Sequence, residues 1–149
     1  MTNHPVLNDA ARALFEPVVL GTLSTINPDG GPQVTLVAAF LDGEEIVHFH
    51  RGWYQKLRNI ERNPKVAFTI VPATDGLGTP GALQPYLVVH GTARIQVGDA
   101  GPWSDRLLDL VEARLPPGEP LQRPEMPAGG GWTTHITPTK IVGVGPWMS

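Results

Sequence analysis

Three short segments rich in β-branched and other apolar residues follow one another in the first third of the chain, separated only by tight turns. The segments are residues 18–26, 33–41 and 45–50, and the turns between them are 27–32 and Asp42-Gly43. Pro, Asp and Gly in these turns favour the backbone angles that a hairpin needs. Strands joined by such short turns pair antiparallel, so the sequence predicts a three-stranded antiparallel meander.

Further segments of regular structure are predicted along the rest of the chain. Strands are predicted at residues 65–71, 86–97, 132–136 and 140–144, with a bulge at Gly91. Helices are predicted at residues 9–16 behind an Asn8 cap, around Leu57 and Ile60, and at residues 103–115. In the last helix, the expected apolar stripe is Leu107, Leu110, Val111 and Ala113. Residues 72–85 and 116–131, rich in Gly and Pro, are predicted to be loops.

Six or seven strands with only three short helices predict a mainly β fold. The 17 Gly and 16 Pro of this 149-residue chain fit many turns and short elements. An open antiparallel sheet of this size would leave long apolar edges unpaired, whereas a barrel removes them. We therefore predict a closed or nearly closed antiparallel barrel that forms one domain over residues 1–149.

Composition argues against several classes of function. The chain has no Cys, which excludes disulfides, thiolate nucleophiles and cysteine-bound metal centres. Its net charge of −3 gives no basic field for nucleic acid. No apolar run approaches the about 20 residues of a membrane span, and no signal-peptide pattern opens the chain. The expected protein is cytoplasmic, with neither nucleic acid nor membrane as a partner.

Metal-dependent chemistry is considered and disfavoured. His48 and His50 lie two residues apart on a predicted strand, so their side chains share one face. With His90 or His135 they could ligate a metal, because imidazole is a common ligand. No carboxylate stands at a matching spacing, so no metal site is predicted.

Hydrolysis by a serine nucleophile and phosphate binding by a glycine loop are also poorly supported. Neither Ser24 nor Ser104 lies in a G-x-S-x-G nucleophile elbow. The glycines at 129–131 precede no helix, so they are interpreted as a hinge rather than a phosphate loop. No catalytic side chain is assigned.

Residues 49–59 favour an anion site. A strand ends, Gly52 permits a sharp bend, and a helix begins with Lys56 in its first turns. The amide groups and dipole at a helix start attract an anion, and Lys56 adds a charge. Arg51 or Arg58 could add a planar donor. An ordinary helix start with solvated side chains explains the same pattern, so the residues alone leave both interpretations open.

Taken together, these segments resemble the split β-barrel flavin-binding superfamily. The resemblance is closest to its pyridoxamine 5′-phosphate oxidase-like and deazaflavin-dependent reductase branches. It covers about residues 14–97, through VLGTLSTINPDGGPQVTLVAAF, EIVHFHRG, KLRNIERNPKVAFTIV and PYLVVHGTARI. The K-x-R-N-x-x-x-N-P-x-V motif is its most specific part, followed by the G-x-P-Q strand opening. The resemblance implies a split antiparallel β-barrel and a homodimer with cofactor sites at its interface.

The resemblance also implies a set of cofactor-binding residues. Those near the flavin-type ring and its ribityl chain are Gln33, Val34 and Thr35. Those near the phosphate are His50 and Lys56, with Tyr54 and Gln55 beside them. Tyr86 matches a position near the cofactor in the deazaflavin branch.

Two departures from the superfamily pattern narrow the expected function. Its oxidases typically place an Arg just before the helix Lys, whereas here Tyr54 and Gln55 precede Lys56. The basic C-terminal residues that pyridoxamine phosphate oxidases use for substrate are missing, which disfavours a vitamin B6 oxidase. The resemblance therefore implies an oxidoreductase that transfers a hydride between a deazaflavin (coenzyme F-420) and a small organic acceptor, with FMN as the second choice of cofactor.

Three alternatives remain beside this function. One is an FMN-dependent oxidase-like protein, and another is a dimer that binds or sequesters a flavin or deazaflavin without turnover. The third is a structural dimer without a ligand, which the reduced set of cations would allow.

Overall fold

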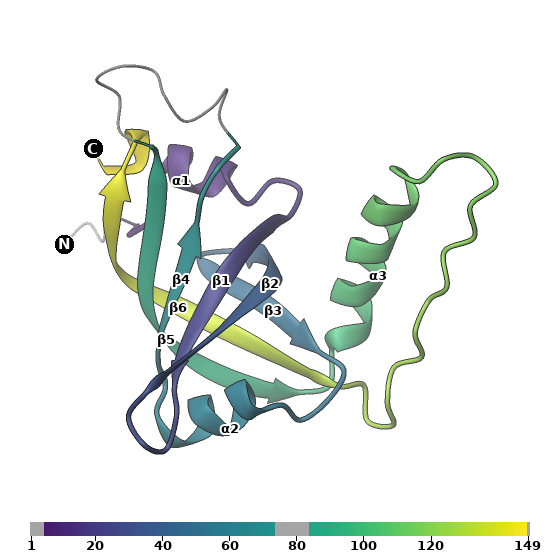
Figure 1. Ribbon diagram of the computed structural model, residues 1–149, viewed down its shortest axis with the longest axis horizontal. Helices are drawn as coiled ribbons and strands as arrows, with labels where there is room; N and C mark the ends of the chain where they lie inside the picture. Colours follow the sequence, from purple (N-terminus) through teal and green to yellow (C-terminus); the bar gives the residue numbers. More distant parts are fainter. Residues whose placement is uncertain (1–4, 74–83, 149) are drawn as a thin grey trace.

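The computed structural model describes residues 5–73 and 84–148. Six strands form a closed antiparallel barrel in the order β1-β2-β3-β6-β5-β4 (Figure 1). The strands are β1 (Val19–Ile26), β2 (Pro32–Asp42), β3 (Glu45–His50), β4 (Lys65–Ile70), β5 (Tyr86–Val97) and β6 (Trp132–Val144). The helices are α1 (Asp9–Ala13), α2 (Gln55–Arg62), α3 (Ala100–Glu112) and the short 3-10 helix η1 (Pro146–Met148). The predicted mainly β fold, with its meander and barrel, is confirmed.

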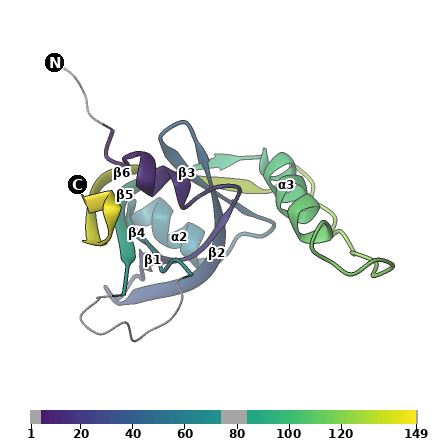
Figure 2. The ribbon, with the colours of Figure 1, turned by 90° about the horizontal axis from the view of Figure 1, so that it is seen from above.

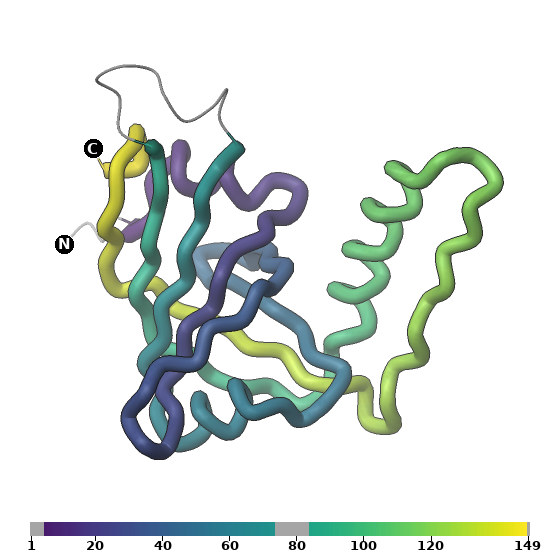
Figure 3. The backbone as a smooth tube through the Cα atoms, in the orientation of Figure 1, coloured from purple at the N-terminus to yellow at the C-terminus, as the bar shows by residue number. Residues whose placement is uncertain are grey.

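The barrel wall is split between β2 and β3. β2 pairs with β1 along its length, from Ala39 to Pro32, but it pairs with β3 only from Phe40 to Asp42. Beyond Phe40 the two strands diverge, as the backbone in Figure 3 shows. On its other edge, β3 pairs with β6 from Ile46 to His50, which lies opposite Trp132. One edge of residues 32–39 of β2 therefore has no strand partner in the described part of the chain, and a groove opens there.

Helices close the two ends of the barrel. α2 covers one end with Leu57 and Ile60, both buried, and α1 covers the other (Figure 1). Phe15, just after α1, stacks on Phe68 of β4 with ring centroids 6.0 Å apart. Each fully buried side chain of this kind contributes about 1.5–3 kcal/mol of transfer free energy. The buried Leu57 and Ile60 fix α2 beside the split, with its first turn at the mouth of the groove.

α3 lies outside the barrel and contacts it near the end of β3. Its first residue, Ala100, joins Phe40 and Phe49 in a small second core, against which Trp103 and Leu107 pack. Figure 2 shows the helix and the segment after it projecting beyond the barrel. None of the helices in the described part of the chain is long and apolar enough to cross a membrane.

The bounds predicted for the third helix are wrong, and its predicted apolar stripe is correct only in part, since Leu107 packs against the second core. α3 begins at Ala100, three residues earlier than predicted, directly after Asp99 in a left-handed conformation. Pro102 does not prevent this start, because the first turn of a helix needs no amide donor. The buried face is accordingly set by Ala100 and Ser104, while Val111 and Ala113 are exposed.

The last two predicted strands are one continuous strand. β6 runs through Pro138, which carries no amide hydrogen, without interrupting the sheet. The pairing with β5 shifts register between His90 and Gly91, which confirms the predicted bulge. Thr139 is the extra residue at the bulge, and its hydroxyl donates to the carbonyl of His90 at 3.1 Å. A proline is tolerated here because the ladder is already irregular.

The first helix is shorter than predicted, while its cap is confirmed. Asn8 accepts a hydrogen bond from the amide of Ala11, as an N-cap does. After Ala13, the amides of residues 14–16 bond to carbonyls three residues back, so the helix tightens into a turn before Pro17. Of the predicted loops, 116–131 is confirmed, and residues 74–83 of the other lie outside the described residues.

Candidate functional site

The groove in the split wall consists of two adjoining hollows that share Tyr54 and Lys56. The first has a volume of about 360 Å³ and is lined also by Gln33, Thr35 and Gln55. The second, about 230 Å³, lies between residues 36–38 of β2, residues 48–51 at the end of β3, and Leu107 of α3. We refer to the two hollows as the split groove. Their volumes are in the range of small-molecule sites.

Six of the eight predicted cofactor residues line the split groove, namely Gln33, Thr35, His50, Tyr54, Gln55 and Lys56. Val34 alternates to the opposite face of β2, where its side chain is exposed. Tyr86 opens β5 opposite Val144, next to η1, at the end of the barrel away from α2 (Figure 1). The structure therefore does not bring Val34 and Tyr86 to the split groove of the same chain.

Lys56 stands at the start of α2, as predicted. Its Nζ lies 5.7 Å from the centre of the Tyr54 ring, and partial burial lowers its pKa. No side chain of the described residues caps the first turn of α2, and the turn itself contains no acidic residue. The helix end thus presents a positive dipole and a cation to the groove without a competing anion.

Gly52 is needed for a different reason from the predicted sharp bend. A Cβ at this position would lie 2.9 Å from the Tyr54 ring, closer than side chains approach one another. The glycine therefore lets the Tyr54 ring pack onto the backbone just before α2, which keeps the ring at the mouth of the groove.

Arg51 supplies a second cation to the wall of the groove. Its Nη2 donates to the hydroxyl of Ser104 on α3 at 2.5 Å, and its guanidinium carbon lies 5.2 Å from the centre of the Phe49 ring. The Nε of Arg51 is buried and has no partner among residues 5–73 and 84–148. A planar guanidinium held in this way is suited to a phosphate or carboxylate.

His48 and His50 lie side by side and are both buried, with ring centres 4.3 Å apart. Nδ1 of His48 lies 3.1 Å from the carbonyl oxygen of Ala38, and Nε2 of His50 lies 2.7 Å from the hydroxyl of Thr134. Burial, and to a lesser degree Lys56, lowers the pKa of His48 to about 3. Burial, then His48 and Lys56, lowers the pKa of His50 to about 2. Both rings are neutral near pH 7.

Buried polar atoms without partners gather in the split groove. In the described part of the chain, four of the five such atoms belong to its lining: Thr35 Oγ1, His48 Nε2, His50 Nδ1 and Arg51 Nε. A buried polar group left without a hydrogen bond costs about 1–3 kcal/mol. Such a cluster beside two cations fits a ligand that carries both an anion and hydrogen-bonding groups, as a flavin phosphate does.

Asn59 joins two side chains that line the first hollow. It is fully buried, and its Nδ2 donates to Thr25 Oγ1 at 3.0 Å and to Gln33 Oε1 at 3.3 Å. Its Oδ1 accepts from Gln55 Nε2 at 2.9 Å. One side chain of α2 therefore positions two groove residues that come from different elements.

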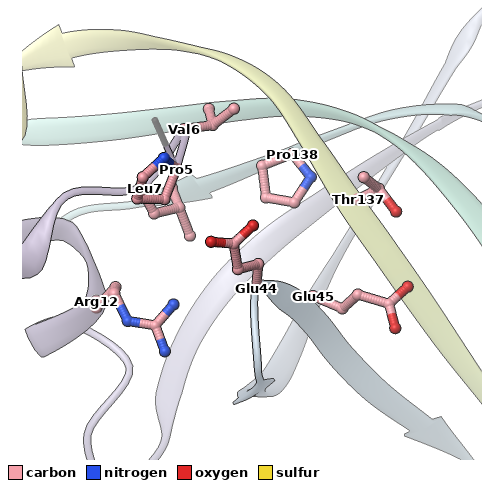
Figure 4. Close-up of a pocket in the computed structure, with 8 residues that line it drawn as sticks. All are labelled: Pro5, Val6, Leu7, Arg12, Glu44, Glu45, Thr137 and Pro138. Carbon is pink, nitrogen blue, oxygen red and sulfur yellow. The ribbon is translucent and has the colours of Figure 1, made fainter. Parts of the chain in front are cut away.

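Two other hollows lack these features. One of about 440 Å³ lies between α2 and β5, but its Arg94 already pairs with Glu45 at 2.9 Å. The other, of about 60 Å³, lies where the N-terminal segment meets the β2–β3 turn and β6 (Figure 4). It is lined by Pro5, Val6, Leu7, Arg12, Glu44, Glu45, Thr137 and Pro138. The hollow of about 60 Å³ is too small for a cofactor. Neither of these two linings contains a buried side-chain atom without a partner.

The three-histidine metal site considered from the sequence is not assembled. His48 and His50 are neighbours, whereas His135 on β6 stands opposite Val47 and His90 opposite Lys140. Within residues 5–73 and 84–148, no group of three or more His, Asp or Glu lies together in a way that could hold a metal ion.

The residues predicted from the sequence leave out several that line or brace the groove, among them His48, Asn59 and Leu107. The sequence indicates His48 only as a possible metal ligand, although its strand spacing from His50 places both on one face. Asn59 is part of the K-x-R-N motif, but nothing in the sequence indicates which elements its side chain joins. Leu107 reaches the groove only because α3 folds back over β3, and no local pattern predicts that.

A protein-family model matches most of the chain. The family model described as pyridoxamine 5′-phosphate oxidase matches residues 7–125. The chain belongs to this family. The match extends from before α1 to the segment after α3, so it contains every residue of the split groove. The resemblance stated from the sequence motifs is therefore confirmed.

Solved structures of similar fold include proteins of several kinds. An F-420 reductase is 30% identical, with 88% of this chain and 94% of that chain covered and a TM-score of 0.64. General Stress Protein 26 from Bacillus anthracis is 22% identical, with 89% and 88% covered and a TM-score of 0.61. A heme binding protein from Mycobacterium smegmatis is 16% identical, with 100% and 57% covered and a TM-score of 0.61. The last two show the fold alone. No curated protein matches the chain.

Proposed function

We propose that this protein is an oxidoreductase that binds a deazaflavin (coenzyme F-420) in the split groove and uses it to transfer a hydride to or from a small organic acceptor. The observation that carries the proposal is the cluster of unpartnered buried polar atoms beside Lys56 and Arg51. Membership in the pyridoxamine 5′-phosphate oxidase family supports a flavin-type ligand for this cluster.

The choice of deazaflavin over FMN rests on the F-420 reductase structure, which is similar over most of both chains. The cations of the groove, Lys56 and Arg51, do not distinguish the two cofactors. FMN remains the second choice, because the same cations fit its phosphate.

With the cofactor bound, four polar residues of the lining would have separate roles. Lys56, Arg51 and the start of α2 would hold the anionic end. Gln33 and Thr35 would orient the ring and its side chain. The cofactor supplies the hydride chemistry, so this chain needs no nucleophile of its own. None of the described lining residues is a carboxylic acid, and both lining histidines are neutral near pH 7.

We further propose that two copies of the chain form the complete site. Leu20 of β1 and Leu36 of β2 lie on one outer face, with exposed fractions of 63% and 69%. They are diagonal neighbours, because Leu20 pairs with Ala38 and Leu36 with Thr22. Leu36 also lines the split groove, so this apolar face continues into the site. A second copy on that face would cover the groove, and Tyr86 could join a cofactor site only from the partner.

The proposal is tested by titrating the purified protein with FMN, riboflavin, FAD and the oxidised deazaflavin, with cofactor fluorescence as the signal. Saturable micromolar binding of the deazaflavin in preference to the others is expected. Preference for FMN would move the protein to the FMN-dependent oxidase-like alternative. Absence of binding by all four would refute the proposed function and leave the structural dimer.

A second measurement separates an enzyme from a protein that only binds or sequesters the cofactor. The protein loaded with reduced cofactor is mixed with a panel of quinones, enones and nitro compounds. Multiple turnovers with any of them support the oxidoreductase. Stable binding with no oxidation of the cofactor by any acceptor would support sequestration.

A further inference from the structure

One ring nitrogen of His48 is bound to the backbone, and the other is free. Nδ1 lies 3.1 Å from the carbonyl oxygen of Ala38. A carbonyl oxygen only accepts hydrogen bonds, so Nδ1 must carry the hydrogen and donate it. In the neutral ring, Nε2 then has a lone pair and no hydrogen. The contact with Ala38 therefore makes Nε2 an acceptor.

The position of His48 fixes where this acceptor lies. Ala38 belongs to the part of β2 that does not pair with β3, so the hydrogen bond from His48 on β3 bridges the split. The ring is 8% exposed and rests edge-on against His50. Nε2 is buried in the lining of the second hollow, where no group of the described residues donates to it. The ring is thus held in one orientation with an unused acceptor.

We propose that Nε2 of His48 accepts a hydrogen bond from an N–H or O–H group of the ligand in the split groove. This inference rests on the proposed function and adds a second recognition element to it. A lone pair repels phosphate oxygens, so His48 does not bind the anion that Lys56 and Arg51 hold. It recognises a donor on the uncharged part of the ligand, such as a ring imide or a ribityl hydroxyl.

Two substitutions separate the acceptor from the packing of the ring. His48→Asn keeps an amide that can donate to Ala38 but removes the acceptor at the position of Nε2. His48→Gln reaches that position with its carbonyl oxygen. Each variant is titrated with the oxidised deazaflavin, with FMN, and with riboflavin, which lacks the phosphate. His48→Asn should weaken the affinity for each ligand that the wild type binds by about tenfold, and His48→Gln should stay within about threefold of the wild type.

The control variant is His135→Gln, at a buried histidine of β6 that does not line the groove. It should leave these affinities unchanged. Nitrogen-15 NMR of the wild-type protein supplies a readout that does not depend on any variant folding. With the five histidines assigned, His48 should show the Nδ1–H tautomer. Its Nε2 resonance should shift upfield on saturation with ligand, without protonation.

The outcomes distinguish this inference from the proposed function. Saturable ligand binding with an unmoved Nε2 resonance, or wild-type affinity in His48→Asn, would overturn the role of His48 and leave the cofactor site intact. A loss confined to FMN, with riboflavin unaffected, would show that His48 acts on the phosphate and would also overturn it. If FMN, riboflavin and the deazaflavin all fail to bind, both proposals fall together.

Discussion

Arg51 at the end of the barrel wall donates from Nη2 to the hydroxyl of Ser104 on α3, at 2.5 Å. This bond joins the projecting helix to the split groove. Ser104 is buried, and the neighbouring Ala100 packs on Phe49, the same ring that faces the Arg51 guanidinium. The outer helix therefore determines where the second cation of the site lies.

Removing the hydroxyl of Ser104 should weaken anion binding without removing the cation. In Ser104→Ala, Arg51 keeps its charge but loses its anchor, so FMN affinity should fall by about threefold. Arg51→Met, which also loses a charge-assisted contact, should lose about tenfold or more. Titration with FMN measures both effects, and riboflavin affinity should not change. Arg114→Met, at an exposed arginine after α3, is the control. Equal binding by Arg51→Met and wild type would remove Arg51 from the site.

Lys56 should contribute to affinity and not to stability. Lys56→Met keeps the apolar stem and removes the charge, so FMN affinity should fall at least several-fold while riboflavin affinity stays the same. The melting temperature should change by no more than about 2 °C, because the charge makes no ion pair among the described residues. Arg58→Met, at an exposed position of the same helix, is the matched control. A change in riboflavin affinity as large as that in FMN affinity would contradict a phosphate contact.

Asn59 should be needed for both stability and the shape of the groove. Asn59→Asp keeps the oxygen that Gln55 bonds to but replaces the donor to Thr25 and Gln33 with a second acceptor. Unsatisfied buried groups predict a loss of about 1–3 kcal/mol in the free energy of unfolding, measured with urea. Cofactor affinity should fall as well, because Gln33 loses its anchor.

The control for Asn59 is Asn63→Asp at the end of the same helix. The Oδ1 of Asn63 accepts from the amide of Lys65 at an exposed site, and a carboxylate can do the same. Its stability should match the wild type. A stable Asn59→Asp protein with unchanged cofactor affinity would show that the hydrogen-bond network of Asn59 does not position the groove.

The meander and the anion-binding segment could be predicted because their signals are local. The turn at Asp42-Gly43 and the alternation along β2 depend on a few neighbouring residues. The start of α2 is likewise marked by Gly52 and Lys56 within one short segment. Residue types with strong local preferences therefore predicted the strands of the barrel and the position of Lys56. The other predicted residues that line the groove came from the resemblance to the superfamily, namely Gln33, Thr35, His50, Tyr54 and Gln55.

What sequence reasoning missed depends on contacts between distant segments. The bond from Arg51 to Ser104 joins residues 53 positions apart. The continuity of β6 through Pro138 goes with the bulge at Thr139, which forms where β6 pairs with His90 and Gly91 of β5. In each of these pairs, one residue gives no indication of the other in the sequence, because each is compatible with many local structures. The ends of α3 were missed for a similar reason, since its buried face is set by Phe40 and Phe49.

Stability should depend on pH through the two buried histidines. In the unfolded chain a histidine has a pKa of about 6.5, whereas burial lowers the pKa of His48 to about 3 and that of His50 to about 2. Below pH 6.5 the unfolded state therefore binds more protons than the folded state. The stabilisation is complete above pH 6.5 and is lost as the pH falls toward 3.

Each histidine contributes a slope of up to about 1.4 kcal/mol per pH unit in that range. Urea unfolding of the wild type and of His48→Gln between pH 8 and pH 4 measures the slopes. Below pH 6 the free energy of unfolding of His48→Gln should fall with pH less steeply than that of the wild type, by up to about 1.4 kcal/mol per pH unit. Above pH 7 the two proteins should show parallel, flat profiles. Identical slopes below pH 6 would mean that His48 titrates alike in the folded and unfolded states.

The proposed two-chain site makes cofactor binding depend on a residue that does not line the groove. Leu20 is exposed on the outer face of β1 and lies outside the described groove lining. Leu20→Arg would place a charge where a second copy should pack. The wild type should have a mass in solution near twice 16.0 kDa, and the variant a mass near 16.0 kDa. Light scattering after size-exclusion chromatography measures both.

Cofactor affinity should fall together with dimerisation, by about tenfold or more, because the groove would lose the chain that covers it. Val97→Arg is the control, since Val97 is 75% exposed at the far end of β5 and away from the β1–β2 face. It should remain a dimer with unchanged affinity. A monomeric wild type, or a monomeric Leu20→Arg protein that binds the cofactor normally, would show that one chain forms the site alone. The exposed leucines would then need another partner, because a face of such residues rarely stays uncovered.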